Sequence, residues 1–120
     1  MAKVVDDFDV TAEPLGRSSV VLTVEGELDI ATAPTLKESL TAALDSGATR
    51  IVVDLSGVTF MDSVSLAAIL HARRRLSGGG RLVCVTPAGS YIRLIFEIAG
   101  GVTLLHVFET RAAAVDALAG

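Results

Sequence analysis

Three runs of apolar residues in the second half of the chain constrain the fold most: Ile51–Leu55, Arg81–Val85 and Val102–Phe108. Nearly every position in these runs is apolar, whereas a strand with one face in water alternates apolar and polar residues. Continuous apolar runs of this length are typical of strands that helices cover on both faces. The segments between and after them have helical spacing, which predicts helices at about Ser63–Leu76, Ser90–Ala99 and Thr110–Ala119. The second half of the chain therefore predicts an α/β sheet.

The first half of the chain predicts an antiparallel hairpin followed by a helix. Phe8–Glu13 alternates apolar and polar residues, which predicts a strand. The sequence PLGR predicts a turn, and Ser18–Leu28 predicts a longer second strand. Apolar residues at helical spacing then mark one helix face: Leu36, Leu40, Ala43 and Leu44. Thr32 and Pro34 suit the start of this helix, and Gly47 suits its end. The two halves together predict one α/β domain over residues 1–120, with a mixed sheet, an N-terminal antiparallel hairpin and about four helices.

Charge and composition exclude several classes of function. The chain has ten basic and fourteen acidic residues and a net charge of −4, whereas nucleic-acid binding needs clustered lysine and arginine, so we expect no nucleic-acid partner. The one cysteine, Cys84, stands inside an apolar run, where we expect a buried core residue in a reducing cytoplasm. No segment reaches the roughly 20 consecutive apolar residues of a membrane span, and the first residues lack a secretion signal. We therefore expect no membrane insertion.

The sequence FMDSVSL, residues 60–66, places Asp62 and Ser63 at a turn between an apolar strand and a helix. A serine nucleophile needs a base within hydrogen-bond reach. Of the two histidines, His71 lies further along the same expected helix, about 12 Å from Ser63 at about 1.5 Å per residue, and His106 lies in the last expected strand. No histidine or cysteine residues have metal-ligand spacing. We therefore expect no catalytic residue, no metal and no cofactor.

A phosphoaspartate receiver domain is a rival interpretation of the same α/β pattern. The sequence VVDD near the start, Asp54 in the third expected strand and Thr86 after the fourth resemble its acidic pair, phosphoacceptor and hydroxyl. Receivers also need a lysine at the end of the last strand, whereas the only lysines here are Lys3 and Lys37. The receiver interpretation is therefore disfavoured.

Three stretches together resemble a STAS domain of the anti-sigma-factor-antagonist type: VEGELDIATAPTL, IVVDLSGVTFMDSVSLAAIL and GGRLVCVTPAGSYIRLIFEIAGG. The resemblance covers about residues 8 to 118, and the motifs follow one another in the order that the family has. GELD followed by AP, and later D-L-S-x-V-x-F-M-D-S, are specific in combination. The fold that this resemblance implies is an α/β domain with a mixed sheet and four or five helices.

The resemblance implies regulation through protein binding, with no catalysis by the chain itself. In such family members, the serine after the aspartate of the MDS turn is phosphorylated by a partner that is both an anti-sigma factor and a serine kinase of the GHKL type. The unphosphorylated protein binds this partner and frees a sigma factor, and a PP2C-type phosphatase removes the phosphate. Carried onto this chain, the phosphoacceptor is Ser63. The implied partner-binding residues are Asp29, Thr32, Asp62, Ser63, Val64, Ser65 and Leu66.

The turn departs from the family pattern directly after Ser63. Family members usually continue as DSSGL or DSTGL, whereas this chain has Val64 and Ser65 at those two positions. Three outcomes stay open: a retuned choice of partner, a shift of the acceptor to Ser65, or loss of phosphorylation. A second function also stays open, a STAS scaffold or accessory subunit of a stressosome-like or lipid-transport complex that binds without a phospho-switch. A purely structural role is the simplest alternative, because serine and aspartate are both preferred helix N-caps.

Overall fold

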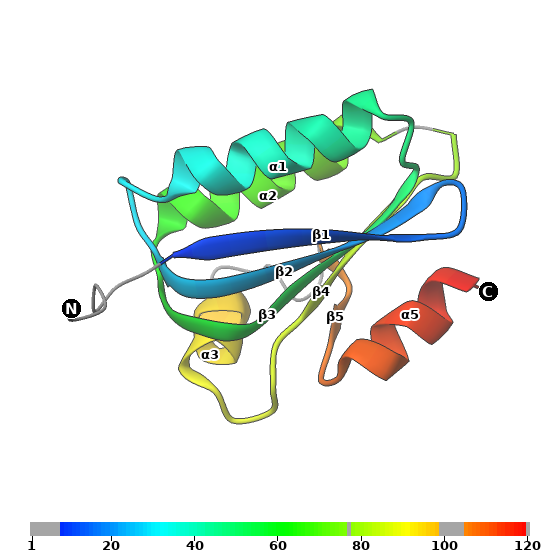
Figure 1. The fold of residues 1–120 in the computed structure, drawn as a ribbon. Coiled ribbons are helices and arrows are strands. Elements are labelled where there is room, and N and C mark those ends of the chain that lie inside the picture. Colours follow the sequence, from blue (N-terminus) through cyan, green and yellow to red (C-terminus); the bar gives the residue numbers. More distant parts are fainter. Residues whose placement is uncertain (1–7, 77, 99–104, 120) are drawn as a thin grey trace, which may run out of the picture.

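The chain forms a five-stranded sheet in the order β1-β2-β3-β4-β5, with helices over its two faces (Figure 1). The computed structural model describes residues 8–76, 78–98 and 105–119. The strands are β1 (Asp9–Leu15), β2 (Ser19–Leu28), β3 (Arg50–Met61), β4 (Arg81–Val85) and β5 (Val107–Phe108). The helices are α1 (Ala33–Asp45), α2 (Ser63–Arg75), α3 (Tyr91–Ile98) and α5 (Arg111–Ala119). β1 pairs antiparallel with β2 and the later pairs are parallel, so the predicted mixed sheet with an N-terminal hairpin is confirmed.

Successive residues of the central strands face two separate cores. Ile51 and Val53 of β3 belong to the larger core with α1 and α2, which lie side by side over one face of the sheet (Figure 1). Val52, between them, belongs to a smaller core with Ala114 and Leu118 of α5, on the opposite face. All three β3 side chains are fully buried. The prediction that helices cover the apolar runs on both faces is confirmed.

Helix α1 begins and ends close to where its sequence predicts. Thr32 is its N-cap and Pro34 lies in its first two positions, where a missing N–H costs no hydrogen bond. Gly47 follows the last turn with φ of 99°, a conformation that glycine adopts without steric cost. On the predicted apolar face, Leu44 is partly buried. The other members of that face are buried: Leu36, Leu40 and Ala43.

Strand β3 is longer than its apolar run predicts. The apolar run Ile51–Leu55 predicts a strand that ends at Leu55, whereas β3 continues to Met61. The continuation pairs with the end of β2, and two register shifts accommodate its polar residues. Glycine at position 57 avoids crowding, because a Cβ there would lie 2.9 Å from the Glu25 Cγ and 3.2 Å from the Val24 carbonyl oxygen. Serine and glycine at positions 56 and 57 are typical of loops, which is why the sequence alone misplaced this strand end.

The last strand is shorter than expected. The predicted strand Val102–Phe108 has residues 102–104 outside the described chain, and β5 itself comprises only Val107 and Phe108. Placing His106 inside a strand was wrong, because this residue has φ of 52° and precedes β5. Leu105 is fully buried, but it is helical and not part of a strand. An apolar run indicates burial equally well for a strand and for a short buried helical segment, so periodicity could not separate the two.

Asp54 of β3 is a structural carboxylate in a hydrogen-bond network that Arg111 of α5 extends to β1 and β2. One oxygen, Oδ1, accepts hydrogen bonds from the Ser56 amide (2.9 Å) and hydroxyl (2.6 Å), and Oδ2 accepts one from Arg111 Nε (2.9 Å). Arg111 also donates to Thr23 of β2 and to Glu13 of β1. Burial alone would raise the pKa of Asp54, but the bonds from Ser56 and Arg111 outweigh burial and lower that pKa.

Replacing Asp54 tests this network. Asp54→Asn is expected to lower the free energy of unfolding by about 2 kcal/mol at pH 7, because it removes a charge-assisted bond to Arg111. The folded-state pKa is lowered, so the wild-type advantage is complete above the unfolded-state pKa of about 3.9 and disappears as the pH falls through the folded-state value. Denaturant unfolding from pH 7 to pH 3 measures this difference.

Asp45→Asn is the matched control, because Asp45 pairs with Arg75 at the exposed surface. Its expected effect is below about 0.5 kcal/mol. Equal losses in the two variants would contradict a special role for the Asp54 network.

Candidate functional site

The ends of β2 and β3 bring two helix starts together. Leu28 and Met61 are partners at the end of the parallel pairing, and the Asp62 amide donates to the Leu28 carbonyl (3.1 Å). The loop before α1 and the turn before α2 therefore lie side by side at one edge of the sheet. Carboxyl ends of parallel strands are where α/β folds usually meet their ligands and partners.

The α2 turn is held by Asp62 rather than by Ser63. Asp62 is the N-cap of α2, and its Oδ1 accepts from the Ser65 amide (2.9 Å) and the Ser65 hydroxyl (2.9 Å). Ser63 is the exposed first residue of the helix, and its hydroxyl makes no hydrogen bond within the described part of the chain. Of the two residues that suit an N-cap, the structure assigns this role to Asp62, and the Ser63 hydroxyl takes no part in the cap.

The two residues that replace the family's small polar residue and glycine point in opposite directions. Val64 is 52% exposed, whereas Ser65 is 0% exposed and bonded to Asp62. Leu66 is also buried. Ser65 and Leu66 therefore support the turn from beneath, and Ser63 and Val64 are the side chains that the first helical turn exposes.

The polar atoms of the α1 loop are largely used within the loop. Asp29 Oδ1 accepts from the Ala31 amide (2.9 Å) and the Thr32 amide (3.1 Å). The Thr32 hydroxyl donates to the Glu27 carbonyl (2.6 Å) and accepts from the Asp29 amide (2.9 Å). These bonds fix the loop in a shape that leaves Ile30 76% exposed.

An apolar groove runs between the first turns of α1 and α2. Its volume is about 510 Å³, and Ile30 and Val64 line it at the end next to Ser63. Further along, the groove is lined by Ala33, Pro34, Ala67, Ala68, Lys37 and His71. Sequence reasoning missed this groove and Ile30. The available signal was an isoleucine directly after Asp29, in a loop where most residues are small or polar.

Within the described ranges of the chain, the groove places no base beside Ser63 and no cluster of metal ligands, although His71 and Lys37 line it. Ser63 and His71 lie on the same helix, so their separation along its axis is about 12 Å. Among the described residues, no group of three or more His, Cys, Asp or Glu side chains could hold a metal ion. Cys84 is fully buried, and burial raises the pKa of its thiol, which therefore stays protonated. In the parts of the chain that are described, each helix is too short or too polar to traverse a bilayer.

The sequence profile of the STAS domain family matches residues 10–114, almost the whole chain. The chain belongs to the STAS domain family. The family resemblance noted in the sequence is thereby confirmed. A related protein, an anti-sigma-B factor antagonist of Staphylococcus aureus, is 35% identical over 86 residues, which cover 72% of this STAS domain chain and 80% of the relative.

Solved structures confirm the STAS fold. An anti-sigma factor antagonist from Mycobacterium paratuberculosis has a TM-score of 0.89 at 24% identity, covering 99% of this chain and 100% of that one. The antagonist SpoIIAA in its unphosphorylated form has a TM-score of 0.78 at 24% identity, covering 93% and 97% of the two chains. The phosphorylated form of the Bacillus cell fate determinant SpoIIAA has a TM-score of 0.68 at 24% identity, covering 90% and 97%.

Two substitutions test whether Asp62, and not Ser63, caps α2. Asp62→Ala is expected to lower the free energy of unfolding by about 1 to 2 kcal/mol, because the Ser65 amide and hydroxyl lose their acceptor. Ser63→Ala is expected to leave unfolding unchanged within about 0.5 kcal/mol, as for other exposed positions. Urea unfolding measures the two values. A larger loss of unfolding free energy for Ser63→Ala than for Asp62→Ala would show that Asp62 is not the capping residue.

Proposed function

We propose that this STAS domain is an anti-sigma factor antagonist that binds an anti-sigma factor through the Ser63 edge and is switched off by phosphorylation of Ser63. One observation carries the proposal: Ser63 is an exposed hydroxyl, free of the helix cap, next to an apolar groove. The names of the relatives support the antagonist role. The chain acts by binding and has no catalysis of its own.

A phosphate at Ser63 is compatible with the fold. The N-terminus of α2 has unpaired backbone N–H groups and a partial positive charge, which stabilise an anion there by roughly 0.3 to 2 kcal/mol. Ser63 is exposed, so the phosphate displaces no core side chain. Phosphorylation therefore leaves the domain folded and changes only what this edge presents to a partner.

The same phosphate opposes docking. It adds about −1.5 to −2 charges that a partner must desolvate, beside the carboxylates of Asp62 and Asp29. Since each 1.4 kcal/mol changes affinity about tenfold, a penalty of a few kcal/mol is enough to release the partner. Electrostatics at a single side chain is therefore a sufficient switch.

The geometry favours Ser63 over Ser65 as the acceptor. The Ser65 hydroxyl is buried and donates to the cap residue Asp62, so a kinase reaches it only after the first turn of α2 opens. Val64 contributes an exposed apolar side chain at the edge of the groove, next to Ile30. We interpret Val64 as a change in partner preference rather than as loss of the phospho-switch.

The partners in this proposal have defined chemistry. The anti-sigma factor is a serine kinase of the GHKL type that transfers phosphate from ATP, and a PP2C-type phosphatase resets Ser63. Both act in the cytoplasm, and neither nucleic acid nor membrane insertion is part of the mechanism. The partner surface comprises Ser63, Val64 and Ile30, supported from beneath by the capped turn and by the Asp29–Thr32 loop.

The phospho-switch is tested by incubating the domain with ATP and its cognate anti-sigma kinase. Phosphate is expected on Ser63, as read by peptide mass spectrometry, and Ser63→Ala is expected to remain unmodified while still binding the kinase. Ser63→Asp is expected to weaken binding at least tenfold, measured by calorimetry. If Ser63→Asp binds as tightly as the wild type and no serine gains phosphate, the surface acts as a constitutive scaffold and the switch is wrong.

The groove is tested by placing a charge in it. Ile30→Asp and Val64→Asp are each expected to weaken anti-sigma factor binding at least tenfold, because a buried carboxylate at the interface has no partner. Ile98→Asp is the control, since Ile98 is 75% exposed and Ile30 is 76% exposed, but Ile98 lies on α3. Thermal unfolding should be similar for all three variants. Equal binding losses for Ile30→Asp and Ile98→Asp would refute the groove as the docking surface.

A further inference from the structure

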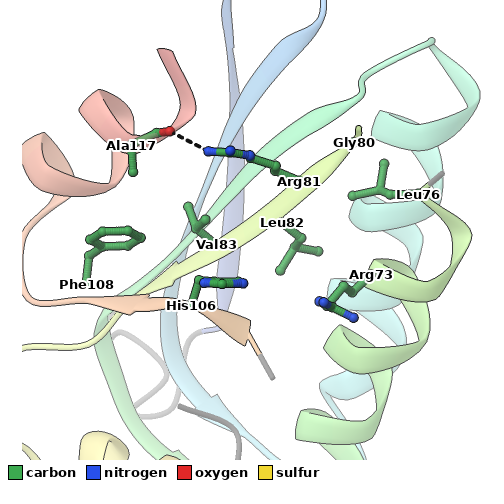
Figure 2. Close-up of a pocket in the computed structure, with 9 residues that line it drawn as sticks. All are labelled: Arg73, Leu76, Gly80, Arg81, Leu82, Val83, His106, Phe108 and Ala117. Carbon is green, nitrogen blue, oxygen red and sulfur yellow. Dashed lines mark hydrogen bonds between the residues drawn. The ribbon is translucent and has the colours of Figure 1, made fainter. Parts of the chain in front are cut away.

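A second cavity lies at the opposite end of α2, away from Ser63 (Figure 2). Its volume is about 430 Å³, within the range of about 300–1,000 Å³ that is typical of small-molecule sites. The last turn of α2, the start of β4, the residue before β5 and the end of α5 surround it. About ten residues of helix, or about 15 Å, separate Arg73 in this cavity from Ser63.

The titratable side chains that line this cavity are all nitrogen bases. They are Arg73, Arg81 and His106, and no carboxylate is among the described residues that line the cavity, although acidic residues outnumber basic ones in the chain by fourteen to ten. Arg81 donates from Nη1 to the Ala117 carbonyl (2.9 Å), which fixes its guanidinium at the rim. Within residues 8–76, 78–98 and 105–119, no carboxylate forms an ion pair with Arg73. The exposed side chains of Arg73, Arg81 and His106 therefore place two guanidinium groups and an imidazole at the cavity, with no carboxylate among the described residues that line it.

His106 is held at the cavity in an unfavourable backbone conformation. Its φ of 52° makes it the single non-glycine residue with positive φ in the described chain. Its carbonyl accepts from the Cys84 amide (3.3 Å), which ties the residue to the edge of β4. Figure 2 shows the imidazole and the Arg73 guanidinium extending toward one another, from the β5 side and from α2. Strain of this kind is often retained where a side chain serves a binding site.

The walls between these nitrogen groups are apolar. Leu76 and Leu82 lie on the α2 side, and Phe108 lies beyond His106 (Figure 2). Positively charged groups with apolar walls match a ligand that has an acidic head and a short apolar body. Hydrogen bonds from a guanidinium to a carboxylate or phosphate are charge-assisted and stronger than neutral ones.

We propose that this cavity binds a small organic anion, a carboxylate or phosphate monoester on a short apolar body. The acidic head lies between Arg73 and His106, and the apolar body lies against Leu76 and Leu82. This site is independent of the proposed partner switch, because it uses neither Ser63 nor the groove between α1 and α2.

Binding is tested on the whole chain by following backbone amide NMR signals during titration. The probes are hexanoate and hexyl phosphate, with hexanol as the uncharged control and inorganic phosphate as the control without an apolar body. Saturable shifts at Leu82 and His106 with hexanoate, hexyl phosphate or both support the proposal, and the two probes separate a carboxylate ligand from a phosphate ester. Any one of three results would overturn the proposal. Hexanol could bind as tightly as hexanoate, inorganic phosphate could bind as tightly as hexyl phosphate, or neither anion could give a saturable shift.

Two variants locate the head group. Arg73→Ala and His106→Gly are each expected to lower the affinity for the anionic probe at least tenfold. Glycine adopts φ of 52° freely, so His106→Gly removes the ring while preserving the backbone. Arg74→Ala is the matched control, because Arg74 has the same charge, is adjacent on α2 and does not line the cavity. If Arg74→Ala weakens binding as much as Arg73→Ala, the attraction is a diffuse charge effect and the site is wrong.

Discussion

The pairing of β2 with β3 along the full length of β2 is the constraint on which the candidate site depends. Because Leu28 pairs with Met61 and its carbonyl accepts from the Asp62 amide, both strands end at the same edge of the sheet. Helices α1 and α2 then start next to each other, and the groove between them begins beside Ser63. A β3 that ended at Leu55 would have left the FMDS turn in a loop with no fixed relation to Ile30.

Sequence periodicity predicted the parts of the fold that depend on burial alone. The spacing of Leu36 and Leu40 identified α1, because a helix with one apolar face has few alternatives. Leu105 shows the limit, since a buried apolar residue in a helical segment has the same pattern as one in a strand. The FMDSVSL turn was located from its motif, whereas an isoleucine after Asp29 was the one sequence signal for the exposed Ile30. That exposure follows from hydrogen bonds that the Asp29 and Thr32 side chains make within the loop, and residue type alone does not give their geometry.

The departure from the family turn has a simple physical interpretation. A serine in place of glycine would obstruct a partner if its side chain pointed outward, but Ser65 points inward and gives Asp62 a second hydrogen-bond donor. The replacement therefore reinforces the cap with a buried side chain. Val64 is the exposed change, and it adds apolar surface next to Ser63 without using the hydroxyl. In the proposed complex, the stability of the turn and the choice of partner would thus depend on adjacent residues.

Helix α2 itself separates the two proposed sites electrostatically. Asp62 at its N-cap and three arginines in its last turn complement the helix dipole, so its two ends have opposite charge. At the Ser63 end, the dipole tolerates a phosphate on the chain, while Asp62 disfavours acidic groups brought by a partner. At the Arg73 end, arginines offset the unfavourable dipole, and the described residues that line the proposed cavity include no carboxylate to compete for an anion. The same charge pattern that stabilises α2 therefore supports the proposal of different ligands at its two ends.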